Sequence, residues 1–111
     1  MKPNNPFTQI KKGTLEYCVL AVIARGEQYG YEIVKILQEQ GLNTPEGTIY
    51  PLLARLKKDG LVTAVWREAE SGNPRKYYTI TARGEEALAE FRASWSEFKT
   101  VVDNILRGGL D

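Results

Sequence analysis

The chain has 111 residues, enough for one domain with a small core, since 42% of them are hydrophobic. The formal net charge is +1, with 11 Lys/Arg against 8 Asp/Glu in residues 1–81 and 4 against 6 in residues 82–111, which permits phosphate binding without requiring it. There is no apolar run of membrane-spanning length, no secretory signal and only one cysteine, so we expect a cytoplasmic protein with no disulfide and no membrane partner.

Two helices are predicted in the first 40 residues. Apolar residues between Gly13 and Gly26 recur at the i, i+3, i+4, i+7 spacing of a helix, and Thr14 is its candidate N-cap. This helix is apolar on most sides, so we expect a partner to cover part of its surface. The second helix runs from about Tyr29 to Gln40, with Gly41 as its C-terminal stop.

A third helix follows after a short turn. Thr44 is its candidate cap, Pro45 suits the first helical position, and Gly60 ends it. Pro51 inside a helix costs about 3 kcal/mol. Either the helix bends at Pro51, or its regular part begins near Thr48. The expected inner stripe consists of Ile49, Leu52, Leu53 and Leu56.

The C-terminal half predicts a hairpin and one long helix. Residues 61–68 and 75–81 are rich in β-branched and aromatic residues and are joined by a short loop of turn formers, which is typical of a hairpin. The last helix runs from about Ala82 to Arg107, with Thr81 as its cap. Its apolar seam has the a/d spacing of a helix–helix contact with another subunit, through Leu88, Phe91, Trp95, Phe98, Val102 and Ile105.

The order of the elements predicts a mainly α (α+β) fold, a winged helix-turn-helix with a long C-terminal dimerisation helix. Residues 1–81 would form the DNA-binding domain. Residues 82–111 would form the dimerisation helix, in one compact unit with the first part. The partners expected on this basis are double-stranded DNA, with an inverted-repeat site that matches a twofold dimer, and a second copy of the chain.

Three segments carry a specific resemblance. YGYEI at Tyr29–Ile33, PEGTIYPLLARLKKDGLV at Pro45–Val62 and NPRKYYTITARG at Asn73–Gly84 resemble the PadR family of bacterial transcriptional regulators, in its short branch with one C-terminal helix. The resemblance implies a DNA-binding repressor. The S-W-S stretch at Ser94–Ser96 is similar to LmrR-type multidrug-sensing members, in which a tryptophan in this context lines a flat-drug pocket at the dimer centre.

Candidate DNA-binding residues lie on the outer side of the third helix and on the hairpin. Thr48 can contact a base edge, Glu46 can accept from a cytosine amino group, and the hairpin cations suit phosphate or minor-groove contact. The alternative for each is an ordinary solvated side chain. The full set is Glu46, Gly47, Thr48, Tyr50, Arg55, Lys58, Asn73, Arg75 and Lys76.

Trp95, in the middle of the seam, is either an interface anchor or a stacking surface for a planar aromatic effector, and the two roles are compatible. Arg92 and Lys99 lie one turn on either side of it, which favours neutral or anionic aromatic ligands over cations. The candidate ligand-binding residues are Tyr17, Phe91, Arg92, Trp95, Phe98 and Lys99.

Enzyme chemistry is not indicated. The chain has no histidine, no cysteine and histidine set for a metal, and no phosphate-binding glycine loop or nucleophile elbow. We expect no catalytic residues, no metal and no cofactor. Two other functions remain open: a winged-helix module that binds protein instead of DNA, and a DNA binder that has no effector.

Overall fold

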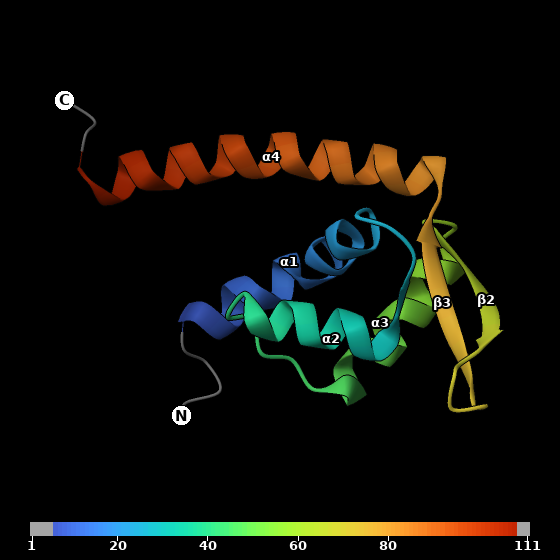
Figure 1. Cartoon of the computed structure of the whole chain (residues 1–111). Coiled ribbons are helices and arrows are strands. Elements are labelled where there is room, and N and C mark those ends of the chain that lie inside the picture. The colour runs from blue at the N-terminus through green and yellow to red at the C-terminus, as the bar shows by residue number, and fades with distance from the viewer. Residues whose placement is uncertain (1–5, 109–111) are drawn as a thin grey trace.

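A computed structural model of the chain describes residues 6–108, and Figure 1 shows the arrangement of its elements. Residues 1–5 and 109–111, the last of which belong to the expected C-terminal unit, lie outside the described residues. The elements in chain order are α1 (Pro6–Ile23), β1 (Gln28–Tyr29), α2 (Gly30–Glu39), α3 (Glu46–Lys58), β2 (Val62–Glu68), β3 (Pro74–Ile80) and α4 (Ala82–Leu106). Three helices, a two-stranded wing and a long last helix confirm the predicted fold class.

The predicted hairpin is part of a three-stranded antiparallel sheet with the order β1-β3-β2. In the wing formed by β2 and β3, Val62 pairs with Ile80 and Glu68 pairs with Pro74. Strand β1 was not predicted from the sequence. Its two residues pair with β3 on the side away from β2. A strand of two residues has no periodicity of its own, and its backbone is fixed by β3.

The core lies between α1, α2, α3, the base of the wing and the first turns of α4. The inner stripe predicted for α3 is buried at all four positions. Leu88 is the only seam residue of α4 that joins the buried core. Tyr78 of β3 is buried as well. Because successive side chains of a strand point to opposite faces, the adjacent Tyr77 lies on the other face of the sheet. The largest fully buried side chains are Leu20, Ile23, Ile33, Ile49, Leu53 and Leu56.

The first helix begins at Pro6, eight residues before Thr14, and Thr14 is therefore not its cap. A proline suits the first helical position because its fixed φ is helical and its missing N–H would be unpaired there anyway. Thr14 lies inside the helix, where its hydroxyl donates to the carbonyl of Ile10 at 3.1 Å. The added turns leave Phe7 and Ile10 exposed, and Ile10 lines a cavity shared with α4.

The cap predicted for α3 is also wrong by one residue. Pro45, not Thr44, is the N-cap, and its carbonyl accepts from the amide of Thr48 at 2.9 Å. Thr44 is buried, and its hydroxyl donates to the carbonyl of Leu42 at 3.4 Å. The helix is continuous through Pro51 and starts two residues before Thr48. The bond that Pro51 cannot donate would go to the carbonyl of Gly47, an exposed residue that water can reach.

The predicted cap of α4 is confirmed. Thr81 accepts from the amide of Gly84 at 3.0 Å and donates to the carbonyl of Gly60 at 2.7 Å, which ties the helix start to the end of α3. Gly84 lies against the carbonyl of Leu61, and a Cβ there would also come 2.7 Å from Ile80 Cγ1. From this anchor α4 runs across α1 and continues beyond the rest of the fold (Figure 1), in a molecule of 62 × 36 × 21 Å.

Candidate nucleic-acid interface

An open groove of about 470 Å³ lies between α3 and the wing. Its wall on the α3 side carries Tyr50 and Lys57, and its wall on the wing side carries Trp66 and Lys76. Tyr29 and Arg75 line the same groove. A groove lined by both aromatic rings and cations suits the sugar–phosphate backbone and bases of a nucleic acid.

Tyr50 is positioned in this groove by contacts below and beside its ring. Gly30, at the start of α2, leaves the space for it, since a Cβ there would lie 2.9 Å from both Cζ and the hydroxyl oxygen of Tyr50. The hydroxyl donates to Glu46 Oε2 at 3.3 Å. Partial burial, together with the neighbouring Glu46 carboxylate, raises the pKa of Tyr50. The hydroxyl therefore stays protonated, and able to donate a hydrogen bond, throughout the neutral pH range.

The wing presents two cations, and each lies over an aromatic ring. Lys76 Nζ is 5.7 Å from the ring centroid of Trp66, its partner in the β2–β3 register. Arg75 Cζ is 4.5 Å from the ring centroid of Tyr29 in β1. Trp66 is 66% exposed although it is among the most apolar side chains of the wing. An exposed tryptophan beside a lysine indicates a surface that contacts a partner.

The other predicted DNA-binding residues are exposed, but they are not all on the groove. Gly47 lies in the first turn of α3 with no atom within 4 Å of the place of a Cβ, so no internal contact explains a glycine there. Arg55 Nη2 lies 3.9 Å from Glu16 Oε1 of α1, on the side of α3 away from the wing. Asn73 lies at the hairpin tip, where its carbonyl accepts from Ala69 N. Glu46, Thr48 and Lys58 complete the exposed set.

Among the groove residues that were not predicted from the sequence are one cation and two aromatic residues: Lys57, Tyr29 and Trp66. Lys57 shares a side of α3 with Tyr50 and follows it by seven residues, a helical spacing that could have identified it. Trp66 and Tyr29 come from two strands that are neighbours of β3, and only the sheet order brings them to the groove.

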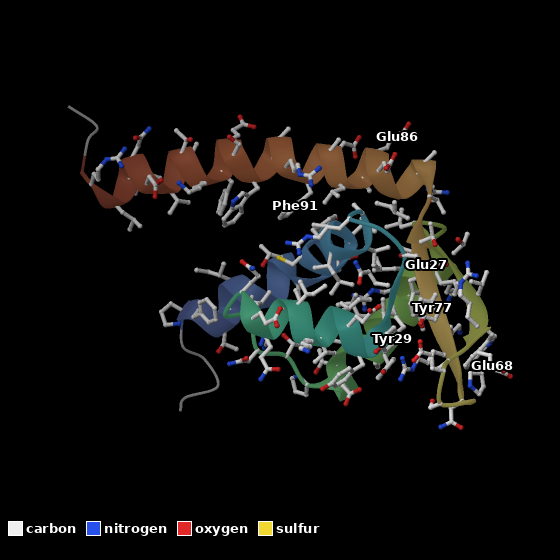
Figure 2. The ribbon with its side chains drawn as sticks, viewed as in Figure 1. Glu27, Tyr29, Glu68, Tyr77, Glu86 and Phe91 are labelled. Carbon is white, nitrogen blue, oxygen red and sulfur yellow. The ribbon has the colours of Figure 1, made fainter. Side chains whose placement is uncertain are left out.

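A second cavity, of about 460 Å³, lies between α1 and the middle of α4. Three of the six predicted ligand-binding residues line it, and Tyr17 reaches it only through its stack with Phe91. The rings of Tyr17 and Phe91 are stacked with centroids 4.3 Å apart and planes 5° from parallel. Phe91 and Trp95 continue the stack at 6.3 Å and 15°. In Figure 2, Phe91 points from α4 toward α1. The cavity is lined by Ile10, Gly13, Thr14, Phe91, Trp95 and Phe98.

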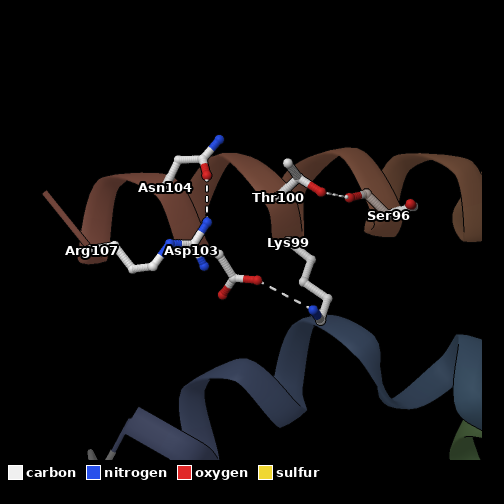
Figure 3. A network of polar contacts seen from close by, with 6 residues as sticks. All are labelled: Ser96, Lys99, Thr100, Asp103, Asn104 and Arg107. Carbon is white, nitrogen blue, oxygen red and sulfur yellow. Dashed lines mark hydrogen bonds and ion pairs between the residues drawn. The ribbon is translucent and has the colours of Figure 1, made fainter. Parts of the chain in front are cut away.

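The two cations predicted beside Trp95 do not line this cavity. Lys99 Nζ lies 3.3 Å from Asp103 Oδ2, one turn further along α4, so its charge is paired within the helix (Figure 3). Arg92 is exposed. The same figure shows Thr100 donating to the carbonyl of Ser96, and Arg107 donating to Asn104.

Neither metal-binding clusters nor membrane spans occur in the described part of the chain. Among residues 6–108, no three His, Cys, Asp or Glu side chains lie together so that they could hold a metal ion. No helix within the same residues has both the length and the apolar character needed to cross a bilayer.

Comparisons with known proteins agree on one family. Residues 19–90 match the family model described as the transcriptional regulator PadR-like family. A PadR-like transcription factor from Bacteroides fragilis is 43% identical, with a TM-score of 0.77 over 92% of this chain and 99% of that one. A PadR family regulator from Eggerthella lenta is 37% identical, with a TM-score of 0.82 over 88% and 86%.

A curated relative extends this result. The negative transcriptional regulator PadR of Bacillus subtilis is 30% identical over 82 residues, which are 69% of this chain and 44% of that protein. The family consists of transcriptional regulators and not of enzymes, as the sequence analysis expected. By the match of its family model and by these structures, the chain belongs to the PadR-like family of transcriptional regulators.

Proposed function

We propose that this regulator is a homodimeric repressor that binds an inverted-repeat DNA site and is released by a planar aromatic effector. The observation that carries the DNA-binding part is the groove between α3 and the wing, which is lined by both cations and aromatic rings. The N-terminal half of α3 enters the major groove with Gly47 and Thr48 toward the bases. The wing lies against the adjacent backbone and minor groove.

The two exposed sides of α3 contact different parts of the DNA. Tyr50 and Lys57 face the wing and contact phosphates of one DNA strand. Thr48 lies on the other side of α3 and reads a base edge or a thymine methyl group. Arg55 and Lys58 are further along the helix and contribute mainly charge, and Arg55 shares its charge with Glu16. The wing contacts the DNA backbone and minor groove through Asn73, Arg75 and Lys76.

The apolar side of α4 supports the dimer. Beyond Leu88 the seam has few partners within the chain, and Phe98 is 62% exposed while Trp95 is 39% exposed. Ile10 extends this apolar surface onto α1. Burying one large side chain stabilises an association by about 1.5–3 kcal/mol, so a second copy of α4 laid on this surface gives a stable dimer.

The effector site is the cavity between α1 and α4, closed by the second subunit. Tyr17, Phe91 and Trp95 already form a stack of nearly parallel rings, and a planar ligand extends it beyond Trp95. Lys99 is paired with Asp103, so of the two predicted cations Arg92 is the one left to attract an anionic ligand, and it does so from outside the cavity lining. The ligand releases DNA to the extent that it prefers a subunit angle that misplaces the two α3 helices.

The repressor role is supported by the relative from Bacillus subtilis, which is named a negative transcriptional regulator. A dimer that covers its site with two α3 helices and two wings would also exclude other proteins from that DNA. The competing function, a winged-helix module that binds protein, would not need the cations of the groove.

Duplex binding measured by fluorescence anisotropy at two salt concentrations tests this proposal. The probes are the DNA upstream of the protein's own gene and a scrambled duplex. Affinity should fall steeply with salt, and Lys76→Ala should weaken binding to both duplexes and flatten the salt dependence. Thr48→Ala should weaken binding to the upstream DNA more than to the scrambled duplex.

The matched control is Arg83→Ala, which removes the same charge from the first turn of α4, away from the groove. It should leave the salt dependence unchanged. Absent or salt-independent duplex binding would instead support the protein-binding module.

A further inference from the structure

Two arginines face each other across the wing, and their side chains have different partners. Arg67 of β2 is in register with Arg75 of β3. Arg67 donates from Nη2 to Glu27 Oε2 at 2.8 Å and from Nε to the same oxygen at 3.1 Å, so its charge is paired. Within residues 6–108, the side chain of Arg75 has no hydrogen bond and no ion pair, and its contact is the ring of Tyr29.

Tyr29 is itself held firmly in place. Its backbone pairs with Tyr77 of β3, and its amide donates to Glu32 Oε1 at 3.0 Å. Its ring meets the ring of Tyr77 edge-on, with centroids 5.3 Å apart and planes at 63°, and Figure 2 shows the two side chains next to each other. The exposed Arg75 therefore rests on a fixed aromatic surface.

Stacking on a ring orients a guanidinium while its N–H edges stay free to donate. It also lowers the conformational entropy that the side chain loses when it binds. Such a pre-oriented arginine on a wing has two kinds of DNA acceptor within reach, namely phosphate oxygens and the floor of the minor groove. Phosphate contacts carry no sequence information, whereas a narrow A·T-rich minor groove concentrates negative potential and attracts arginine.

We propose that Tyr29 is a positioning residue that holds Arg75 for insertion into the minor groove next to the α3 site. Recognition then includes a preference for A·T-rich flanks that no contact of α3 supplies. Lys57 and Lys76 line the same groove between α3 and the wing as Arg75, and they supply positive charge for the phosphates there. This leaves Arg75 for the minor groove of the DNA. This inference rests on the proposed DNA-binding function.

The experiment uses three duplexes of equal length, one of A-tracts, one of alternating G·C, and the G·C duplex with inosine in place of every guanine. Inosine lacks the minor-groove amino group of guanine but keeps its major-groove acceptors. Dissociation constants are measured for the full chain and for Tyr29→Leu, Tyr29→Phe, Arg75→Ala and Arg67→Gln. Thermal melting of each variant shows that it is folded.

The parent protein should bind the A-tract and inosine duplexes more tightly than the G·C duplex. Tyr29→Leu should reduce this preference by about two- to fivefold, the worth of one exposed cation–π contact. Tyr29→Phe should retain it, because the ring remains. Arg75→Ala should abolish it, and Tyr29→Leu should then have no further effect. Arg67→Gln, whose charge is already paired with Glu27, should keep the preference.

Equal affinity of the parent for the inosine and G·C duplexes, with normal salt dependence, would overturn the minor-groove role and leave the proposed function standing. An unchanged preference in Tyr29→Leu would overturn the positioning role of the ring. Failure of the parent to bind any of the three duplexes would contradict the proposed function itself.

Discussion

The ring of Tyr50 lies directly against the backbone of Gly30, so that a Cβ on Gly30 would come 2.9 Å from its hydroxyl oxygen. Gly30 is the first residue of α2, and Tyr50 lies in the second turn of α3. The two residues belong to separate segments of the sequence that carried the family resemblance. The contact explains why a glycine begins α2, and it sets the position of the Tyr50 hydroxyl at the groove.

Gly30→Ala should displace the Tyr50 ring and weaken DNA binding without unfolding the protein. Tyr50 is partly exposed and can rotate away, so stability should change by only about 0.5 kcal/mol. Duplex affinity should fall about tenfold, as expected for one lost hydrogen bond to a charged group. Thermal melting and anisotropy on the same samples measure both effects. If Gly30→Ala binds DNA as the parent does, Tyr50 has no part in the interface.

Gly47→Ala should move stability and DNA binding in opposite directions. Nothing lies within 4 Å of the added methyl group, and alanine in a helix interior is about 0.5–1 kcal/mol more favourable than glycine. The melting temperature should therefore rise, while the methyl group keeps DNA from the exposed side of α3 and lowers affinity. A variant that is more stable and binds equally well would show that this side of α3 does not approach DNA.

The sequence was most informative where a local signal and the fold agreed. Thr81 is both a good cap and the first residue after a strand, and α4 begins there as predicted. Thr14 and Thr44 are equally good caps by type, but one lies inside α1 and the other is buried. Their roles were set by Pro6, which starts α1 earlier, and by the core that encloses Thr44.

The groove could be predicted only in part. Tyr50, Arg75 and Lys76 were identified because they are polar residues on a predicted helix face and a hairpin. The ion pair of Arg55 with Glu16 and the stack of Arg75 on Tyr29 join residues far apart in the chain. Such contacts depend on the crossing of α1 with α3 and on the place of β1 in the sheet, which periodicity does not determine.

Phe98→Asp should dissociate the proposed dimer, because it would bury an unpaired carboxylate in the apolar seam. Thr100→Asp is the matched control, since it places the same charge two residues along α4, on the opposite face. Sedimentation equilibrium should show a dimer for the parent and the control and a monomer for Phe98→Asp. A parent protein that is monomeric at tens of micromolar would refute the dimer.

Planar aromatic compounds should quench Trp95 saturably. Trp66 also emits, so the measurement needs a Trp66→Phe background in which Trp95 is the remaining tryptophan. Each stacking contact contributes about 0.5–1.5 kcal/mol beyond area burial, so Trp95→Ala should weaken binding several-fold or more and stay dimeric. Ligand binding by Trp95→Ala is measured by calorimetry. If the variant binds with the affinity of the parent, Trp95 is an interface anchor and not part of the ligand site.

The emission of Trp66 in a Trp95→Phe background, followed while duplex DNA is added, tests the central claim most directly, because Trp66 lines the groove between α3 and the wing. The account predicts a saturable change in Trp66 emission with the same midpoint as the anisotropy titration, shifting to higher DNA concentration as salt is raised. Duplex binding that leaves the emission of the exposed Trp66 unchanged would contradict it, since DNA would then bind elsewhere on the protein.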